Sequence, residues 1–135
     1  ENVIVFYKNA PTYNPQMVPG EPYKRIHRKG NREDCVYNKD TRGDGFTVEN
    51  EGTRFPRTVL KISNNNAGRG SLHPTQKPLE LFEYFVKTYT NVGDLVFDPF
   101  CGSGTTAAAC SLLNRNFLCF EKEEKYFKIA CDRVF

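Results

Sequence analysis

The chain has 135 residues, of which 39% are hydrophobic and 26% are charged, and its formal net charge at pH 7 is +3. This length allows one domain, or part of one, with a buried core, and the charge is too small to indicate a polyanionic partner by itself. No apolar run reaches the length of a membrane-spanning helix and no signal-peptide pattern opens the chain, so we expect no membrane partner.

The cysteines indicate a reducing environment. The five of them, Cys35, Cys101, Cys110, Cys119 and Cys131, are odd in number and show no CxxC spacing. This pattern favours free thiols in a cytoplasmic protein over a disulfide framework, and it predicts no metal site. The chain begins at Glu1 and has its only methionine at residue 17, so we interpret it as a piece of a longer polypeptide.

The first part of the chain combines one apolar run with polar sequence. Val3–Tyr7 consists of β-branched and aromatic residues, which predicts a strand inside a covered sheet. Lys8–Pro22 is rich in Pro, Asn and Gly and is predicted to be a loop. Tyr23–Asn50 has little periodicity, so an irregular region is expected, with turn residues at Asp40–Gly45 that indicate a hairpin or an exposed tip.

A cluster of basic residues lies in this irregular region. It consists of Lys24, Arg25, Arg28, Lys29 and Arg32. Taken alone, such a cluster is more often a solvated loop face than a binding site. The functional alternative is a surface that contacts phosphates, with Tyr23, His27 and Tyr37 able to stack on bases.

The middle of the chain predicts a strand, a loop and a helix. Arg57–Ile62 is expected to be a second strand, and Ser63–Leu72 has no apolar face to bury, so it is expected to be a surface loop. A helix is predicted over Leu79–Tyr89, because Pro78 suits a first turn and apolar residues recur at helical spacing. Those residues are Leu79, Phe82, Phe85, Val86 and Tyr89, and we interpret them as core packing.

The last part of the chain predicts a β–α–β unit and a closing helix. Leu95–Phe97 is a strand that stops at Asp98, and a turn with two glycines leads into a helix from about Thr105 to Leu113. Asn114 is expected to end that helix in the left-handed conformation. The next strand is Phe117–Glu121 and the last helix Glu123–Val134, and a right-handed crossover is expected to make the two strands parallel.

The glycine turn indicates a ligand-binding site. Gly102 and Gly104 let the backbone approach a ligand, and the helix that follows offers its N-terminus to an anion. The spacing also fits the dinucleotide-binding pattern, but Asp98 at the strand tip would repel a pyrophosphate. A P-loop is excluded, because no Lys follows Gly104. A ligand with an ammonium for Asp98 and a carboxylate for the helix is an amino acid, and S-adenosylmethionine has such an end.

Glu121 is the second acidic candidate. Crossover geometry places the end of its strand beside the tip of the first strand, and a carboxylate there can accept both hydroxyls of a ribose. The alternative is a surface acid in an acidic stretch with Glu123 and Glu124. The motif context favours the ligand role.

Four blocks of the sequence together resemble the amino-specific DNA methyltransferases of the circularly permuted class often called β. Asp98–Thr105 (DPFCGSGT) resembles the cofactor motif I of that family, and His73–Pro78 (HPTQKP) resembles its motif X. Phe120–Tyr126 resembles motif II with its helix, and Glu1–Lys8 resembles the strand before the target-recognition region. Motif X immediately before motif I is the order of the permuted class.

The resemblance implies a fold and its division. The fold would be α/β, a Rossmann-like S-adenosylmethionine-dependent methyltransferase fold with an incomplete sheet. Residues 1–8 and 57–135 would form this cofactor-binding core, and residues 9–56 an irregular target-recognition insertion. Lys24, Arg25, Arg28, Lys29 and Arg32 would contact double-stranded DNA.

The resemblance also implies the cofactor-binding residues. They are Thr75, Gln76, Lys77, Pro78, Asp98, Pro99, Phe100, Gly102, Ser103, Gly104, Thr105, Glu121 and Lys122. Asp98 would face the ammonium of S-adenosylmethionine, Phe100 would pack near the cofactor, and Glu121 would hold the ribose. The turn and helix start would lie under the carboxylate, and residues 75–78 would close over the methionine end.

One motif of the family is missing. Its catalytic segment, a short Pro-Pro-aromatic motif, holds the flipped base and orients its amine. No two prolines are adjacent in this sequence, so no catalytic residue is assigned, and we expect the chain alone to be inactive without the N-terminal half of the enzyme. Cys101, in the turn, is expected to be a small packing residue.

The expected function is therefore that of a fragment of a DNA methyltransferase. The complete enzyme would transfer a methyl group from S-adenosylmethionine to N6 of adenine or N4 of cytosine. The alternatives are a non-catalytic module that binds S-adenosylmethionine or DNA, a methyltransferase for RNA or another amine, and a dinucleotide-dependent oxidoreductase.

Overall fold

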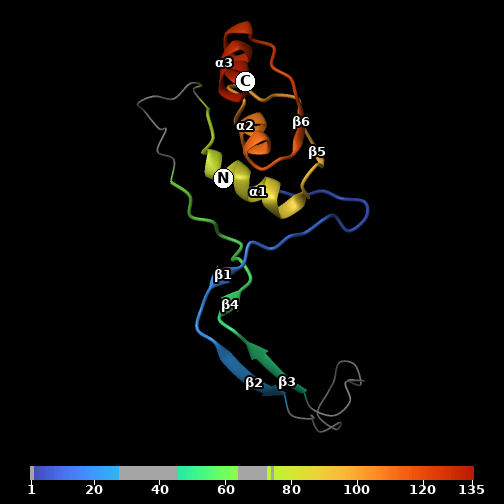
Figure 1. The fold of residues 1–135 in the computed structure, drawn as a ribbon, viewed down its shortest axis with the longest axis vertical. Helices are drawn as coiled ribbons and strands as arrows, with labels where there is room; N and C mark the ends of the chain where they lie inside the picture. Colours follow the sequence, from blue (N-terminus) through green and yellow to red (C-terminus); the bar gives the residue numbers. More distant parts are fainter. Residues whose placement is uncertain (1, 28–45, 64–72, 74) are drawn as a thin grey trace. The chain divides into compact units, whose positions relative to one another are not determined.

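The computed structural model describes residues 2–27, 46–63, 73 and 75–135. Contacts divide the chain into two compact units, one made of Glu1–Gln16 with Arg57–Phe135 and the other of Met17–Pro56. Among the described residues, the helices and the parallel strands belong to the larger unit, and the antiparallel strands to the smaller (Figure 1). The functional division expected for residues 9–56 stays a prediction.

The larger unit is built around the predicted β–α–β arrangement. β5 (Leu95–Asp98) and β6 (Asn116–Cys119) pair in parallel, so that Asp98 lies opposite Cys119. The helix that connects them, α2 (Thr105–Leu112), lies between α1 (Leu79–Tyr89) and α3 (Glu124–Val134) (Figure 1). Asn114 follows α2 with a φ of 57°, which confirms the left-handed ending.

The core of this unit forms around α2. Ala109 and Cys110 of α2 are fully buried, and Val86 of α1 packs against them. The small side chains of α2 allow its neighbours to approach closely. The partly buried residues around this cluster are Leu79, Phe82, Val96, Leu113 and Phe117. Three residues of the predicted stripe of α1, Leu79, Phe82 and Val86, therefore contribute to this core, whereas Phe85 and Tyr89 contact each other and neighbouring tyrosines.

Among the described residues, the sheet of β5 and β6 is covered on one face. Val96 and Phe117 pack against the core. Because successive side chains of a strand point to opposite faces, Leu95, Phe97 and Leu118 lie on the other face, where they are exposed. The sheet of this unit thus presents an apolar surface on the side away from α2.

Two expected strands do not form. Val3–Tyr7 pairs with no strand among the described residues, and the side chain of Phe6 is 88% exposed. Arg57–Ile62 likewise adopts no strand. Both expectations were wrong for the same physical reason. Apolar and β-branched residues favour extended backbone, but a strand also needs a neighbour for its backbone hydrogen bonds.

The N-terminal segment is instead fixed to the end of α1 by Asn14. Its backbone N–H donates to the carbonyl of Thr88 at 2.7 Å, and its side-chain amide donates to the carbonyl of Thr90 at 3.1 Å. The last carbonyl groups of a helix have no partner within the helix, so these bonds satisfy one end of α1.

The described residues of the smaller unit form two antiparallel strand pairs. β2 (Tyr23–His27) pairs with β3 (Phe46–Asn50), and β1 (Val18–Pro19) pairs with β4 (Thr53–Arg54). These strands correct the irregular structure expected at residues 23–27 and 46–50 and the loop expected at residues 18–19, whereas residues 28–45 lie outside the described part of the chain.

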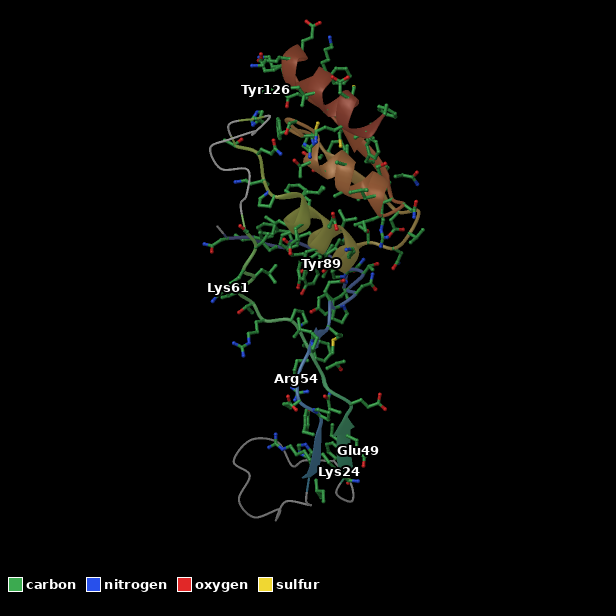
Figure 2. The ribbon with its side chains drawn as sticks, turned by 60° about the vertical axis from the view of Figure 1, so that its left-hand side comes forward. Lys24, Glu49, Arg54, Lys61, Tyr89 and Tyr126 are labelled. Atoms are coloured by element: carbon green, nitrogen blue, oxygen red, sulfur yellow. The ribbon has the colours of Figure 1, made fainter. Side chains whose placement is uncertain are left out.

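Contacts between opposite side chains explain how a polar sequence forms this hairpin. Lys24 and Glu49 form an ion pair across β2 and β3 (Figure 2). The rings of His27 and Phe46 stack with their centroids 4.6 Å apart. Cross-strand pairs of these kinds stabilise a sheet without a continuous apolar face. Lys24 and Arg25, expected in a loop, are therefore in a strand.

Two predicted loop segments lie outside the part of the chain that is described. One is the turn at Asp40–Gly45. The other is the loop at Ser63–Leu72, of which only Ser63 is described. Within residues 2–27, 46–63, 73 and 75–135, no helix has the length and apolar character needed to cross a membrane.

Candidate functional site

A glycine turn joins β5 to α2. Gly102 and Gly104 have φ values of 54° and 76°, in the left-handed region that favours glycine. The N–H of Gly104 donates to the carbonyl of Cys101 at 2.9 Å, and the carbonyl of Gly104 accepts the N–H of Ala108 at 2.9 Å. No described side chain caps α2, and no acidic residue stands in its first turn. The N-terminus of α2 therefore suits an anionic group.

Gly104 is also a packing residue. A Cβ atom at this position would lie 2.7 Å from Cβ of Ala130 in α3, which is too close for any side chain. The sequence assigned the glycines to the approach of a ligand, whereas the nearest neighbour of Gly104 is α3. At Gly102 a Cβ would make ordinary contact with the ring of His73, 3.5 Å away.

The carboxylate of Asp98 is bonded to the turn. Its Oδ1 accepts the backbone N–H of Phe100 at 3.0 Å, and its Oδ2 accepts the hydroxyl of Thr106. A carboxylate has about four acceptor positions, so Asp98 can still accept from another donor, such as an ammonium. Thr106 was not predicted as a site residue, and its buried hydroxyl fixes the carboxylate from the first turn of α2.

Glu121 is bonded to the same turn from the end of β6. Its Oε2 accepts the N–H of Gly102 at 2.9 Å, and its Oε1 accepts the N–H of Glu123 at 2.9 Å. The N–H of Glu123 has the largest effect and lowers the pKa of the Glu121 carboxyl; burial opposes it, and the N–H of Gly102 adds a smaller lowering effect, so that the pKa is lowered in sum. The structure thus brings together Asp98, Gly102 and Glu121, as the crossover geometry predicts.

His73 links the segment before α1 to this turn. Its Nδ1 accepts the N–H of Thr75 at 3.2 Å, and its carbonyl accepts the N–H of Gln76 at 3.0 Å. On its other side the ring meets Tyr126 of α3 edge-on, with centroids 4.2 Å apart. Because the same ring lies close to the Cβ position of Gly102, it places residues 75–78 near the glycine turn.

Three further candidates lie on the outside of the turn and of the following strand. Pro99 and Phe100 are exposed, Phe100 at 88%, and Lys122 is exposed beyond β6.

Other candidates are less exposed. Pro78 and Lys77 are half-buried at the start of α1. Ser103 and Thr105 are buried, at 3% and 5% exposure, so little of either residue is open to a ligand.

The cysteines near the site are not reactive groups. The described cysteines Cys101, Cys110, Cys119 and Cys131 are free, and Cys35 lies outside the described residues. Burial raises the pKa of the thiols of Cys101, Cys110 and Cys119, that of Cys119 to about 12. Because a thiol attacks as its thiolate, these three are poor nucleophiles at neutral pH.

Sequence reasoning did not single out Arg133 of α3. Its Nη1 lies 2.6 Å from the carbonyl oxygen of Ser103, in the glycine turn. The one available signal was its spacing of three residues from Ala130, which puts both on one side of a helix. No motif marks a lone Arg in a last turn, so only the folded chain reveals this contact.

The candidate DNA-contacting residues are only partly described. Arg28, Lys29 and Arg32 lie outside the described residues. In β2, Lys24 points to the face where Glu49 lies, and Arg25 points to the opposite face with Tyr23 and the stacked His27. The two described members of the basic cluster therefore lie on opposite faces of the hairpin, with Lys24 paired to Glu49 and Arg25 on the face that carries Tyr23 and His27.

Comparison with known proteins places this chain in a family. The family model described as DNA methylase, of the N6/N4 type, matches residues 1–132. The Type II methyltransferase M.BglII of Bacillus subtilis is 32% identical over 133 residues, which is 94% of this chain and 34% of that protein. The Type II methyltransferase M2.DpnII of Streptococcus pneumoniae is 45% identical over 62 residues, 46% of this chain and 23% of that protein.

A solved structure supports the fold. The crystal structure of the M1.HpyAVI–SAM complex is 32% identical to this chain, with a TM-score of 0.51, and the match covers 87% of this chain and 63% of that one. The predicted α/β, Rossmann-like methyltransferase fold is thereby confirmed. The chain spans about a third or less of the length of the curated relatives given above. The glycine turn, its two carboxylates and the match along nearly the whole sequence lead to one conclusion: this chain belongs to the N6/N4 DNA methylase family.

Proposed function

We propose that this chain is the cofactor-binding and target-recognition part of an amino-specific DNA methyltransferase. The complete enzyme would transfer a methyl group from S-adenosylmethionine to N6 of adenine or N4 of cytosine in double-stranded DNA. The observation that carries the proposal is the convergence of Asp98 and Glu121 on the turn: each carboxylate accepts a backbone N–H from that segment.

The residues of the turn fit an amino-acid ligand with a ribose. Asp98 would accept the ammonium, the uncapped N-terminus of α2 would receive the carboxylate, and Glu121 would accept from the ribose hydroxyls. The exposed ring of Phe100 would supply an apolar contact, and Thr75–Pro78 would flank the methionine end. Cationic and anionic ends of one ligand are thus matched by an acid and a helix N-terminus.

Positioning is the contribution expected from this chain. When bound, S-adenosylmethionine supplies a methyl group that its positive sulfonium makes electrophilic. The chain's own residues would hold the donor in a fixed orientation, which lowers the entropic part of the barrier. The proposal assigns no general base or nucleophile here. The described thiols near the turn are held protonated, and Asp98 and Glu121 are bonded to the backbone.

To act on a DNA base, this chain would need a second segment that binds the extruded base. Extruding a base costs a few kcal/mol, and an amine-binding loop must then orient it. Because the sequence holds no adjacent prolines, we propose that the chain alone lacks transferase activity and that a segment with the Pro-Pro-aromatic motif complements it. The smaller unit would supply DNA contacts through its hairpin, with Arg25 as a basic residue on the face that carries Tyr23 and His27.

Calorimetry on the 135-residue chain tests the cofactor site. S-adenosylhomocysteine is expected to bind with one site per chain, D98A to weaken that binding by about tenfold, the order of one charge-assisted hydrogen bond, and NAD to give no heat. Binding of NAD without binding of S-adenosylhomocysteine would contradict the proposal and favour a dinucleotide-dependent oxidoreductase.

A transfer assay tests the missing catalytic part. With labelled S-adenosylmethionine and duplex DNA, no incorporation is expected from the chain alone, and incorporation is expected after addition of the N-terminal half of a relative that carries the motif. Incorporation by the isolated chain would refute the claim of inactivity. Binding of both ligands with no incorporation in any combination would favour a non-catalytic binding module, and a preference for RNA over duplex DNA would favour an RNA enzyme.

A further inference from the structure

Arg133 connects the last turn of α3 to the glycine turn. Its Nη1 lies 2.6 Å from the carbonyl oxygen of Ser103 and 3.3 Å from the hydroxyl oxygens of both Ser103 and Thr105. All three acceptors belong to residues that are almost fully buried. A hydrogen bond from a charged donor to a buried acceptor is among the stronger contacts of a folded chain.

The bond from Arg133 completes the restraint of one peptide group. The group between Ser103 and Gly104 donates its N–H to the carbonyl of Cys101 at 2.9 Å and accepts from Arg133 at its oxygen. Three residues before Arg133, Ala130 is in van der Waals contact with Gly104. α3 therefore fixes the turn at two points, one by packing and one by a hydrogen bond.

The electrostatic surroundings of Arg133 are unusual for a partly buried guanidinium, because hydroxyl and carbonyl oxygens surround it. Among the described residues, no carboxylate forms an ion pair with this guanidinium, which donates instead to a carbonyl and two hydroxyls. Burial lowers the pKa of Arg133, although a guanidinium stays protonated at neutral pH. A positive charge thus stands behind the N-terminal end of α2, where the helix dipole is also positive.

We infer that Arg133 is a positioning residue for the amino-acid end of the ligand. It holds the turn in the conformation that presents the N-terminus of α2, and its charge adds to the attraction for the ligand carboxylate. The inference rests on the proposed function, since it takes the turn to be the site of an amino-acid-bearing cofactor. Arg133 itself acts through Ser103 and Thr105 and is not assigned a contact with the ligand.

The chain contains a matched control in Arg115. This side chain also makes three hydrogen bonds, from Nε to the Thr90 hydroxyl at 3.1 Å, from Nη2 to the Thr90 carbonyl at 2.9 Å and from Nη1 to the Leu113 carbonyl at 2.7 Å. These partners follow the C-terminal ends of α1 and α2, away from the glycine turn. Removing either guanidinium deletes similar bonds, but only one of them supports the turn.

The experiment compares R133Q, R133K and R115Q with the unmodified chain, using two ligands. S-adenosylhomocysteine carries the amino-acid end, and 5′-methylthioadenosine lacks it. Calorimetry gives both affinities, and thermal denaturation without ligand gives the stability of each variant. R133Q is expected to bind S-adenosylhomocysteine about tenfold more weakly and methylthioadenosine within about twofold of the unmodified chain. R133K, which keeps the charge but not the planar fork, is expected to lie between the two.

The results distinguish three cases: Arg133 positions the ligand, Arg133 only stabilises the fold, or the chain does not bind the cofactor. R115Q is expected to lower the melting temperature and to leave both affinities unchanged. If R133Q loses affinity equally for both ligands, or loses affinity for neither, the positioning role is overturned. If R133Q does not fold, the two affinities of R133K decide by the same criterion. Absence of S-adenosylhomocysteine binding by the unmodified chain would instead overturn the proposed function, and the inference with it.

Discussion

Gly102 donates its backbone N–H to Oε2 of Glu121 at 2.9 Å, across 19 residues of sequence. This bond ties the turn after β5 to the end of β6, so the two segments that are expected to hold opposite ends of the cofactor are held at a fixed spacing. Glu121 is thus a structural part of the turn before any ligand arrives, and its substitution should affect both stability and binding.

Replacing Glu121 by Gln should weaken S-adenosylhomocysteine binding and alter the acid stability of the chain. The folded-state pKa of Glu121 is lowered, so the stabilisation is fully present above the ordinary pKa of 4.5 and is lost as the pH falls through the lower folded value. Thermal melts of E121Q should therefore depend less on pH below about pH 4.5 than those of the unmodified chain. Glu51→Gln, at an exposed carboxylate of the smaller unit, serves as the control, and equal pH profiles for E121Q and the unmodified chain would contradict the role of these bonds.

Gly104→Ala should destabilise the chain by about 2–4 kcal/mol, because the new Cβ would strain the backbone and overlap Ala130. Gly93 is a matched control, since it also has a positive φ, 85°, but has open space around its Cβ position. Gly93→Ala should cost only about 1 kcal/mol for the backbone conformation. Urea denaturation measures both. A loss at Gly104 no larger than that at Gly93 would show that α3 can move away from the turn.

The buried thiols should react slowly in the folded chain. Burial raises the pKa of Cys119 to about 12, so at pH 8 its thiolate population is very small. Mass spectrometry after brief treatment with iodoacetamide should find Cys119 and Cys110 unmodified in the native chain and modified in urea. Cys101→Ala should retain S-adenosylhomocysteine binding; loss of binding in that variant would show that the thiol contributes more than packing.

Substitutions of Arg25 and Glu49 in the hairpin should show whether its basic side chains contact DNA. Arg25→Ala should weaken duplex DNA binding and reduce the slope of log affinity against log salt by about 1, the value for one lost phosphate contact. Glu49→Gln should strengthen binding, because it removes an acid and leaves Lys24 without its partner. Fluorescence anisotropy over a range of salt concentrations checks both, with Lys128→Ala in α3 as the control. Equal effects of Arg25→Ala and the control would exclude this hairpin face as a DNA contact.

Where patterns are local, the sequence predicted the structure well. The helix Leu79–Tyr89 begins and ends as expected, because Pro78, an apolar stripe and the turn after Tyr89 all act within a few residues. Glu121 was placed beside the turn correctly, since a parallel crossover brings the carboxyl ends of both strands to one edge.

Features that depend on a partner distant in sequence were not predictable. Val3–Tyr7 has the composition of a strand, yet no described segment pairs with it. The β2–β3 hairpin was missed because its stability comes from cross-strand contacts such as Lys24–Glu49, which have no periodic signature. Arg133 was missed for a related reason: the reach of one long side chain from α3 to Ser103 follows from helix packing and not from any motif.

The close approach of Ala130 to Gly104 sets a limit on how far the chain can be trimmed. Removal of α3 would delete both of its supports for the turn, the methyl group of Ala130 and the guanidinium of Arg133, and would uncover Ser103. A minimal cofactor-binding fragment must therefore extend through the last turn of α3, even though the proposed ligand contacts end at Lys122. For protein engineering, the C-terminal end of such a fragment is set by the residues that support the glycine turn and not by Lys122, the last proposed ligand contact.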